Sequence, residues 1–273
     1  MFLVPFFKDL ERLSLPSFLG DQPSAPAPAP APTTMLGAAQ ASLAQHIYLF
    51  DTEVANVVSD VGAGSPLDLT LGGFGGIATI STSGLAPGCV GKLILDADQD
   101  AGYIENADWN RDADRSLELV MDIYGGGNDR SFFIGPGEYN ETKNFCQLNL
   151  TQAGSPRNWV ITDEAWTTKL DLGSAGLDQD TQTGLLYLCI SWNEATNTIR
   201  CRGKRDGESQ FNLSASWSSG ASGTGKFYLG GNTVPGGGGN IHTNTTMHIH
   251  HFAVYDSVLS DEEITTRLGI LEI

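Results

Sequence analysis

Residues 247–268, MHIHHFAVYDSVLSDEEITTRL, contain the two patterns that decide the fold. The first part alternates apolar with polar side chains and is rich in β-branched and aromatic residues, which predicts a half-buried strand with one slip of phase near His251. Ser260 and Glu263 then form a capping box, and the spacing of four between Ile264 and Leu268 predicts a short helix. The chain is therefore expected to close with a long strand followed by a helix.

Part of this stretch, residues 252–264, resembles the ending of laminin-G-like, concanavalin-A-like lectin/glucanase domains, which have the form hydrophobic-Tyr-x-x-x-Leu-Ser-x-x-Glu-Ile. Residues 185–203, LLYLCISWNEATNTIRCRG, and residues 226–231, KFYLGG, are similar to two other strands of that family. The resemblance covers about residues 46–270 and implies an antiparallel two-sheet β-sandwich of the jelly-roll type. Family members often have an acidic residue where this chain has His250, which speaks against a metal site inherited from the family.

Upstream of this ending, short apolar-polar runs separated by turns recur along the chain, which has 33 Gly and 12 Pro. Strands are expected at residues 47–50, 67–71, 92–95, 117–124, 131–134, 145–150, 158–162, 185–192, 198–202, 211–217 and 226–229. In residues 117–124, Leu117, Leu119 and Met121 share one face of the strand. Regular short strands with turns between them favour a sandwich, so the fold class is all-β, with a short C-terminal helix and an extended N-terminal anchor peptide.

Two segments without strand pattern precede the sandwich. Residues 1–20 are dense in apolar side chains with no local partner, including Phe2, Leu3, Val4, Phe6, Phe7 and Leu10. Such a cluster is typical of a partner surface, so these residues are expected to anchor the chain to a larger assembly; an atypical export signal is the alternative. Residues 21–45 are expected to be a spacer, with a Pro-Ala tract in polyproline II conformation followed by a short helix or stalk. After these two segments, residues 46–273 are expected to form the sandwich itself, a lectin-like head.

The charge balance excludes several classes of partner. The formal net charge is −17 and the chain has 15 Lys and Arg residues, whereas nucleic-acid binding requires clustered basic side chains. Binding to nucleic acid and to anionic membranes is therefore not expected, and the apolar N-terminal run is too short to span a bilayer. The acidity is typical of a protein kept soluble in a crowded or salty medium, or of a surface rich in bound calcium.

The carboxylates do not form a glycosidase pattern. Relatives that cleave β-glucans have Glu-x-Asp-x-x-Glu on one strand, and this motif is absent. Glu118 and Asp122 share a face, but four residues along a strand span roughly 13 Å, which is too far for a retaining pair. We expect both side chains to face solvent or ligand. The chain is expected not to be an enzyme, with a degenerate glycan-cleaving enzyme as the alternative.

Two kinds of metal site are suggested by the sequence. Asp96, Asp98 and Asp100 alternate as hard oxygen ligands for calcium do, and residues 106–114 contain a second spaced acidic run; solvated turns are the alternative. His248 and His250 lie on one face of the last strand with His251 beside them. These histidines fit either a transition-metal pair or hydrogen-bonded positions in a sheet.

Two of the cysteines fall in one expected hairpin. If the hairpin is centred on Ala195, Cys189 and Cys201 lie directly opposite each other. A cross-strand disulfide or two buried free thiols would both fit that position.

Aromatic residues flanked by Asp or Asn suggest a carbohydrate site, because sugars present both apolar C–H faces and hydroxyls. The candidates lie in expected loops and comprise Trp109 with Asp108 and Asn110, and Tyr139 with Asn140. Trp159, Trp192 and Trp217 fall within expected strands and are interpreted as core residues.

The order of parts, an apolar docking peptide, a stiff spacer and a lectin-like head, resembles virion-attached bacteriophage proteins such as capsid decorations, head fibres and tail adhesins. This layout implies a place on the virion surface, contacts with other virion structural proteins through residues 1–20, and a homo-oligomer. The head is expected to bind host or environmental glycans. A secreted carbohydrate-binding module is the alternative.

Overall fold

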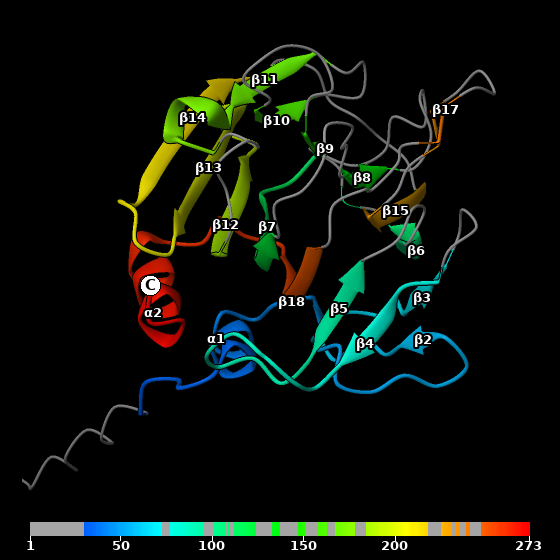
Figure 1. Cartoon of the computed structure of the whole chain (residues 1–273). Coiled ribbons are helices and arrows are strands. Elements are labelled where there is room, and N and C mark those ends of the chain that lie inside the picture. The colour runs from blue at the N-terminus through cyan, green and yellow to red at the C-terminus, as the bar shows by residue number, and fades with distance from the viewer. Residues whose placement is uncertain are drawn as a thin grey trace, which may run out of the picture. The chain divides into compact units, whose positions relative to one another are not determined.

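Two antiparallel sheets face each other in the computed structural model of the unit Pro32–Ile273 (Figure 1). The structure describes residues 30–72, 77–95, 101–107, 109, 112–123, 133–136, 147–150, 158–162, 167–177, 184–217, 225–230, 233–234, 239–240 and 247–273. Within these ranges each sheet has eight strands. The predicted all-β sandwich with a short C-terminal helix is confirmed; the predicted anchor peptide lies outside the described residues.

The first sheet, sheet A, runs in the order β14 (Phe211–Ser216), β13 (Thr198–Arg205), β12 (Gly184–Asn193), β7 (Arg115–Ile123), β18 (Met247–Tyr255), β5 (Lys92–Leu95) and β4 (Thr79–Ser81), with β1 (His46–Tyr48) also paired to β18. The second, sheet B, runs β11 (Thr168–Asp171), β10 (Trp159–Thr162), β9 (Gln147–Leu150), β8 (Phe133–Pro136), β15 (Gly225–Gly230), β6 (Ala101–Ala107), β3 (Leu69–Leu71) and β2 (Val57–Val58). A separate ribbon pairs β16 (Thr233–Val234) with β17 (Gly239–Asn240).

The predicted slip of phase in the last strand is a β-bulge in β18. The register with β7 shifts between Ile249 and His251, so His250 is the extra residue. Ile249 and Phe252 consequently both face the core between the sheets, although an even alternation would place them on opposite faces. The bulge also marks a change of neighbour, because β18 pairs with β5 before it and with β1 after it.

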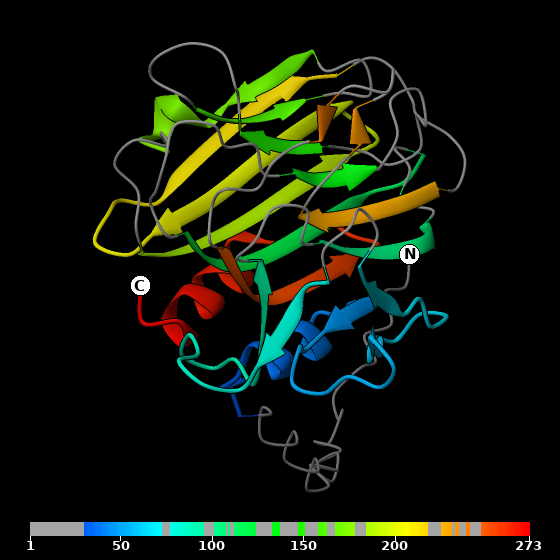
Figure 2. The same cartoon turned by 45° about the vertical axis from the view of Figure 1, so that its right-hand side comes forward.

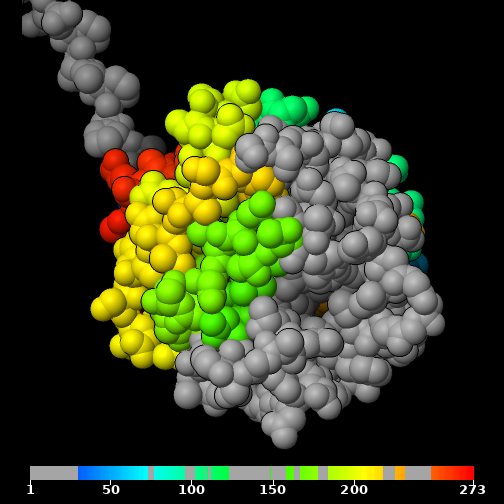
Figure 3. Space-filling model, turned by 90° about the horizontal axis from the view of Figure 1, so that it is seen from above, coloured from blue at the N-terminus to red at the C-terminus, as the bar shows by residue number. Residues whose placement is uncertain are grey.

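The core between the sheets follows the alternation that the sequence predicts. Leu117, Leu119 and Met121 of β7 point into it, and the three strand tryptophans expected in the core, Trp159, Trp192 and Trp217, are buried. At one edge, β11 of sheet B lies against β14 of sheet A. Figure 3 shows the green residues of β10 and β11 beside the yellow residues of β13 and β14. The two sheets are therefore in contact through β11 and β14 at this edge.

Helices α1 (Met35–Ala41) and α2 (Asp261–Ile270) lie beside each other against sheet A, on the face turned away from sheet B (Figure 2). The predicted capping box of α2 is confirmed, with Ser260 and Glu263 exchanging both hydrogen bonds. Met35 of α1 is buried in the same outer cluster as Tyr255. Residues from Pro32 onward therefore form one compact unit with the sandwich, because α1, the short helix expected in this segment, buries apolar area on it. Neither of these described helices is long and apolar enough to cross a membrane.

Glu118 is the centre of this outer layer, which corrects the expectation that it faces solvent or ligand. It is fully buried, and its Oε1 lies 2.5 Å from Nε of Arg267 in α2 and accepts a hydrogen bond of 2.9 Å from the Tyr187 hydroxyl. The Tyr255 hydroxyl donates to Oε2, and His251 Nε2 lies 3.3 Å from the same oxygen. Burial would raise the pKa of Glu118, but the Arg267 charge and these hydrogen bonds lower it to about 2. The carboxylate therefore stays ionised and holds α2 on the sheet.

Arg267 links the same centre to the first helix. Its guanidinium donates to the carbonyl of Ala38 at 3.2 Å and to the hydroxyl of Ser42 at 3.0 Å. The buried ion pair thus connects β7, α1 and α2, which are far apart in the sequence.

The predicted pairing of Cys189 with Cys201 is wrong by one residue. Ile190 lies opposite Cys201, and Cys189 lies opposite Arg202, because residues 194–197 form the turn of the hairpin. A shift of one residue turns side chains to opposite faces, so Cys201 lies in the core between the sheets and Cys189 in the outer cluster. Both are buried free thiols, which was the alternative to a disulfide.

Candidate functional site

Trp109, expected as an exposed sugar platform, is buried with 2% of its surface exposed. Its ring centroid lies 4.5 Å from that of Phe227 in β15 and 6.0 Å from that of Phe252 in β18. The indole thus fills the space between the sheets just after β6 ends. The interpretation as an exposed stacking platform is wrong, because a platform must leave a face of its ring open to the ligand and this indole is almost completely buried.

An open pocket of about 220 Å³ lies beside this tryptophan, and we call it the Trp109 pocket. It is found where β7 begins and β18 ends, and its lining comprises Gln45, His46, Gly64, Ser65, Leu67, Trp109, Arg115 and Asp256. The partly buried Leu67 supplies apolar surface, the buried Trp109 forms part of the wall, and the other side chains supply hydrogen-bonding groups. Arg115 and Asp256 form an ion pair with each other, so their charges compensate.

His46 enters this pocket from the start of β1, and Asp60 fixes its orientation. His46 Nδ1 lies 2.6 Å from Oδ2 of Asp60, whose side chain is 1% exposed. The same carboxylate accepts backbone N–H groups from Ile47 at 3.0 Å, Gly62 at 2.9 Å and Leu67 at 3.1 Å. Burial raises the pKa of Asp60, but the hydrogen bonds from His46 and these three N–H groups bring it below its ordinary value.

An ionised Asp60 can only accept, so in the neutral imidazole the proton is on Nδ1 of His46 and Nε2 keeps its lone pair. His46 lines the pocket and Asp60 does not, so we infer that the edge of the ring opposite Asp60, with Nε2, is directed toward the pocket. Within the described part of the chain, no residue forms a hydrogen bond with Nε2. The pocket therefore contains an oriented hydrogen-bond acceptor. Residues 46 and 60 form no recognised motif, and no sequence signal would have identified the pair.

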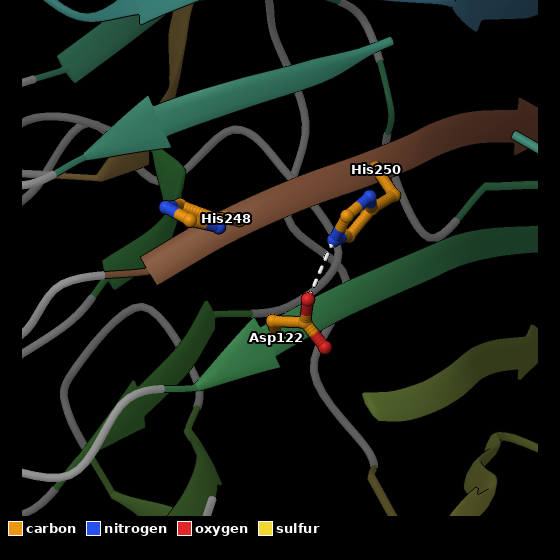
Figure 4. A group of neighbouring side chains, drawn as sticks. All are labelled: Asp122, His248 and His250. Atoms are coloured by element: carbon orange, nitrogen blue, oxygen red, sulfur yellow. Dashed lines mark hydrogen bonds and ion pairs between the residues drawn. The ribbon is translucent and has the colours of Figure 1, made fainter. Parts of the chain in front are cut away.

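Asp122, His248 and His250 form a second group, in which one ligand atom from each lies within 4.8 Å of the others (Figure 4). Asp122 is the third partner that the sequence did not identify for the two histidines. His250 Nδ1 accepts the N–H of Ala86 at 3.1 Å, and Nε2 lies 2.9 Å from Asp122 Oδ2. Because a peptide N–H can only donate, the proton of His250 is on Nε2, directed at Asp122. A metal at Nε2 would have to replace that proton, so the arrangement fits the hydrogen-bonded sheet position rather than a metal pair.

A smaller pocket of about 90 Å³ lies between residues 175–177, which follow β11, and the turn that joins β13 to β14. Its lining includes Arg205, Glu208 and Ser209, and Arg205 is paired with Glu208 at 2.9 Å. It has no aromatic side chain apart from Phe211. This pocket is therefore the weaker candidate for a sugar.

The other predicted site residues lie outside the described residues. They are Asp108, Asn110, Tyr139 and Asn140 of the carbohydrate site, Asp96, Asp98 and Asp100 of the calcium site, and Phe2, Leu3, Val4, Phe6, Phe7 and Leu10 of the anchor. Calcium binding, anchoring and the sugar contacts of these residues stay predictions.

Comparison with known proteins shows the fold of the chain. No protein-family model matches it, and no curated protein is similar to it in sequence. The binding domain of botulinum neurotoxin DC in complex with SialylT has a TM-score of 0.54 at 10% identity, over 85% of this chain and 51% of that chain. Botulinum neurotoxin type C, whose cell entry depends upon interaction with two ganglioside molecules, has a TM-score of 0.52 at 10% identity, over 85% and 52%.

A sialidase from Trypanosoma rangeli in complex with sialic acid has a TM-score of 0.52 at 12% identity, over 83% of this chain and 32% of that chain. The chain thus spans about half or less of the length of these structures. At such identities the likeness concerns architecture alone. The chain has a two-sheet antiparallel β-sandwich fold that is similar to a part of each of these structures.

Proposed function

We propose that the chain is a non-enzymatic, lectin-like protein that binds a glycan in the Trp109 pocket and is displayed on a virion surface. The observation that carries the glycan proposal is the pocket itself, in which the partly buried Leu67 adjoins the polar groups of Gln45, Ser65 and Arg115, with the buried Trp109 in the wall. Sugars need this combination, because their C–H faces and their hydroxyls must both be met. The glycan ligands in the descriptions of three proteins of the same fold support the proposal.

The size of the pocket favours a small epitope. Its volume of about 220 Å³ is below the roughly 300–1,000 Å³ of drug-sized ligand sites, so we expect it to accept one sugar ring of a longer chain. Apolar burial contributes roughly 25 cal/mol per Å², so a single ring yields weak affinity once the entropy of association is subtracted. Many copies on one particle would raise the avidity, which suits display on a virion.

The carboxylates near the pocket support binding without cleavage. Among the described residues that line it, Asp256 is the one acidic side chain, and it is paired with Arg115. Asp60 lies behind His46 and accepts four hydrogen bonds, and Glu118 is fully buried in the outer layer. Glycoside hydrolysis needs two carboxyl groups, one on each side of the bond that is cleaved. No two of Asp256, Asp60 and Glu118 lie together in the pocket in this way.

Replacing Ser65 with Trp tests the site. Ser65 is exposed at the rim, so a large side chain can fill the Trp109 pocket without entering the core. We expect the Ser65→Trp chain to keep its thermal unfolding midpoint and to lose at least tenfold in glycan-array binding by multivalent protein. Ser209→Trp is the matched control, because Ser209 is also exposed but lines the smaller pocket.

Two results of this experiment would contradict the proposal. Loss of binding in Ser209→Trp alone would move the glycan site to the smaller pocket beside the turn that joins β13 to β14. If the unaltered chain in multivalent form bound no glycan on the array, glycan binding itself would be refuted. Product analysis of bound oligosaccharides after long incubation would reveal any cleavage.

Deleting residues 1–20 tests the virion proposal. The apolar density of these residues motivates it, and the compact unit begins only at Pro32. We expect the truncated chain to unfold at the same temperature and to bind the same glycans as the full chain, while no longer being incorporated into particles. Incorporation at the level of the full chain would refute the anchoring role of these residues.

A further inference from the structure

We infer that His46 Nε2, oriented by Asp60, accepts a hydroxyl of the ligand in the Trp109 pocket and makes the site selective for neutral sugars over acidic ones. This inference rests on the proposed glycan function and specifies the ligand class and the residue that recognises it. Three observations support it: Nδ1 of His46 contacts Asp60, His46 lines the pocket, and Nε2 has no hydrogen-bond partner among the described residues.

The acceptor role follows from how tightly Asp60 is held. Its two oxygens receive four hydrogen bonds, three of them from backbone N–H groups. Those backbone donors hold the carboxylate of Asp60 in place. Its Oδ2 lies 2.6 Å from Nδ1 of His46, so in the neutral ring the proton is on Nδ1. If the proton moved to Nε2, or if the ring rotated, the hydrogen bond from Nδ1 to Asp60 would be lost. A ligand group that meets Nε2 must therefore donate a proton, as a hydroxyl does and as an ionised carboxylate does not.

The charges around the pocket favour the same ligand class. Arg115, the one Arg or Lys side chain among the described lining residues, is already paired with Asp256. Asp60 adds a negative charge directly behind His46, and the whole chain has a net charge of −17. A carboxylate of an acidic sugar would meet a lone pair and no surplus positive charge. A neutral sugar can instead donate one hydroxyl to His46, while Ser65 can donate to its neighbouring hydroxyl.

Two substitutions of His46 separate the acceptor from the support of Asp60. In His46→Asn the amide NH₂ can replace the Nδ1–H donor to Asp60, but nothing remains at the position of Nε2. In His46→Gln the longer side chain restores a polar group near Nε2. We expect His46→Asn to keep the unfolding midpoint within a few degrees and to lose about three- to tenfold in affinity for a neutral glycan identified on the array, with partial recovery in His46→Gln. Equal affinities of the unaltered chain and His46→Asn would overturn the inference.

The tautomer can be observed directly in the unaltered full chain. In ¹⁵N-edited NMR spectra of the histidine rings at pH 8, we expect His46 to have a protonated Nδ1 and an unprotonated Nε2, and the Nε2 resonance to move when the neutral glycan is added. A protonated Nε2, or an Nε2 resonance unmoved at saturating glycan, would overturn the inference while leaving glycan binding intact. Preference for sialylated over neutral glycans on the array would also overturn it. The absence of any glycan ligand would instead refute the proposed function.

Discussion

Replacing Glu118 with Gln should lower the free energy of unfolding by about 3–5 kcal/mol, because it leaves the buried guanidinium of Arg267 without its counter-charge. The side chain keeps its shape, so the loss reports charge and hydrogen bonding rather than a cavity. Tyr187 and Tyr255 would also lose an ionised acceptor. Urea denaturation followed by tryptophan fluorescence measures the effect.

The matched control is Glu105→Gln on β6. Glu105 is paired with Lys226 at 3.1 Å, but both side chains are about half exposed, so we expect a loss below about 1 kcal/mol. If Glu118→Gln cost no more than Glu105→Gln, the buried centre would not be an ion pair.

The same centre makes the protein sensitive to strong acid. The pKa of Glu118 is about 2 in the folded chain and near its ordinary value of 4.5 in the unfolded one. The unfolded state therefore binds this proton more readily, so the contribution of Glu118 to stability is complete above about pH 4.5 and is lost as the pH falls toward 2. We expect the difference in stability between the unaltered chain and Glu118→Gln to shrink over that interval. A difference that stayed constant down to pH 2 would contradict the assignment.

Replacing Trp109 with Ala should also cost about 3–5 kcal/mol, because the indole is packed between Phe227 and Phe252 and its removal leaves a cavity. The measurement is the free energy of unfolding in urea. Val54→Ala is the control, since Val54 is 78% exposed and should change stability by less than about 0.5 kcal/mol.

The Trp109 substitution also separates a packing residue from an exposed platform. A platform in a loop would lose glycan binding and keep its stability. If Trp109→Ala unfolded at the same urea concentration as the unaltered chain, the tryptophan would not belong to the core.

The sequence was sufficient for the features that depend on local pattern. Alternation in residues 117–124 predicted which side chains of β7 face the core, and the spacing of Ser260 and Glu263 predicted the start of α2. Even the bulge in β18 was visible as a break in alternation near His251. In each case the physical cause lies within a few residues of its effect.

Features set by distant contacts could not be predicted in this way. Trp109 stands among polar residues and was therefore interpreted as a loop position, but Phe227 and Phe252 bury it from other strands. The cysteine register depended on whether the turn has an odd or an even number of residues, which no propensity decides. His46 and Asp60 meet because the segment around Asp60 folds back onto β1.

The bulge at His250 has a consequence for how this strand could change during evolution. Residues 247–249 and 251–255 alternate regularly between the two faces if His250 is left out, because Met247, Ile249, Phe252 and Val254 all face the core. His250 is thus equivalent to a single-residue insertion that leaves the inward and outward pattern of the flanking segments unchanged. The strand can gain or lose a polar side chain at this point, where β5 gives way to β1, without exchanging one core residue for another. This position is a place where lineages of the fold can diverge in chemistry while conserving their interior.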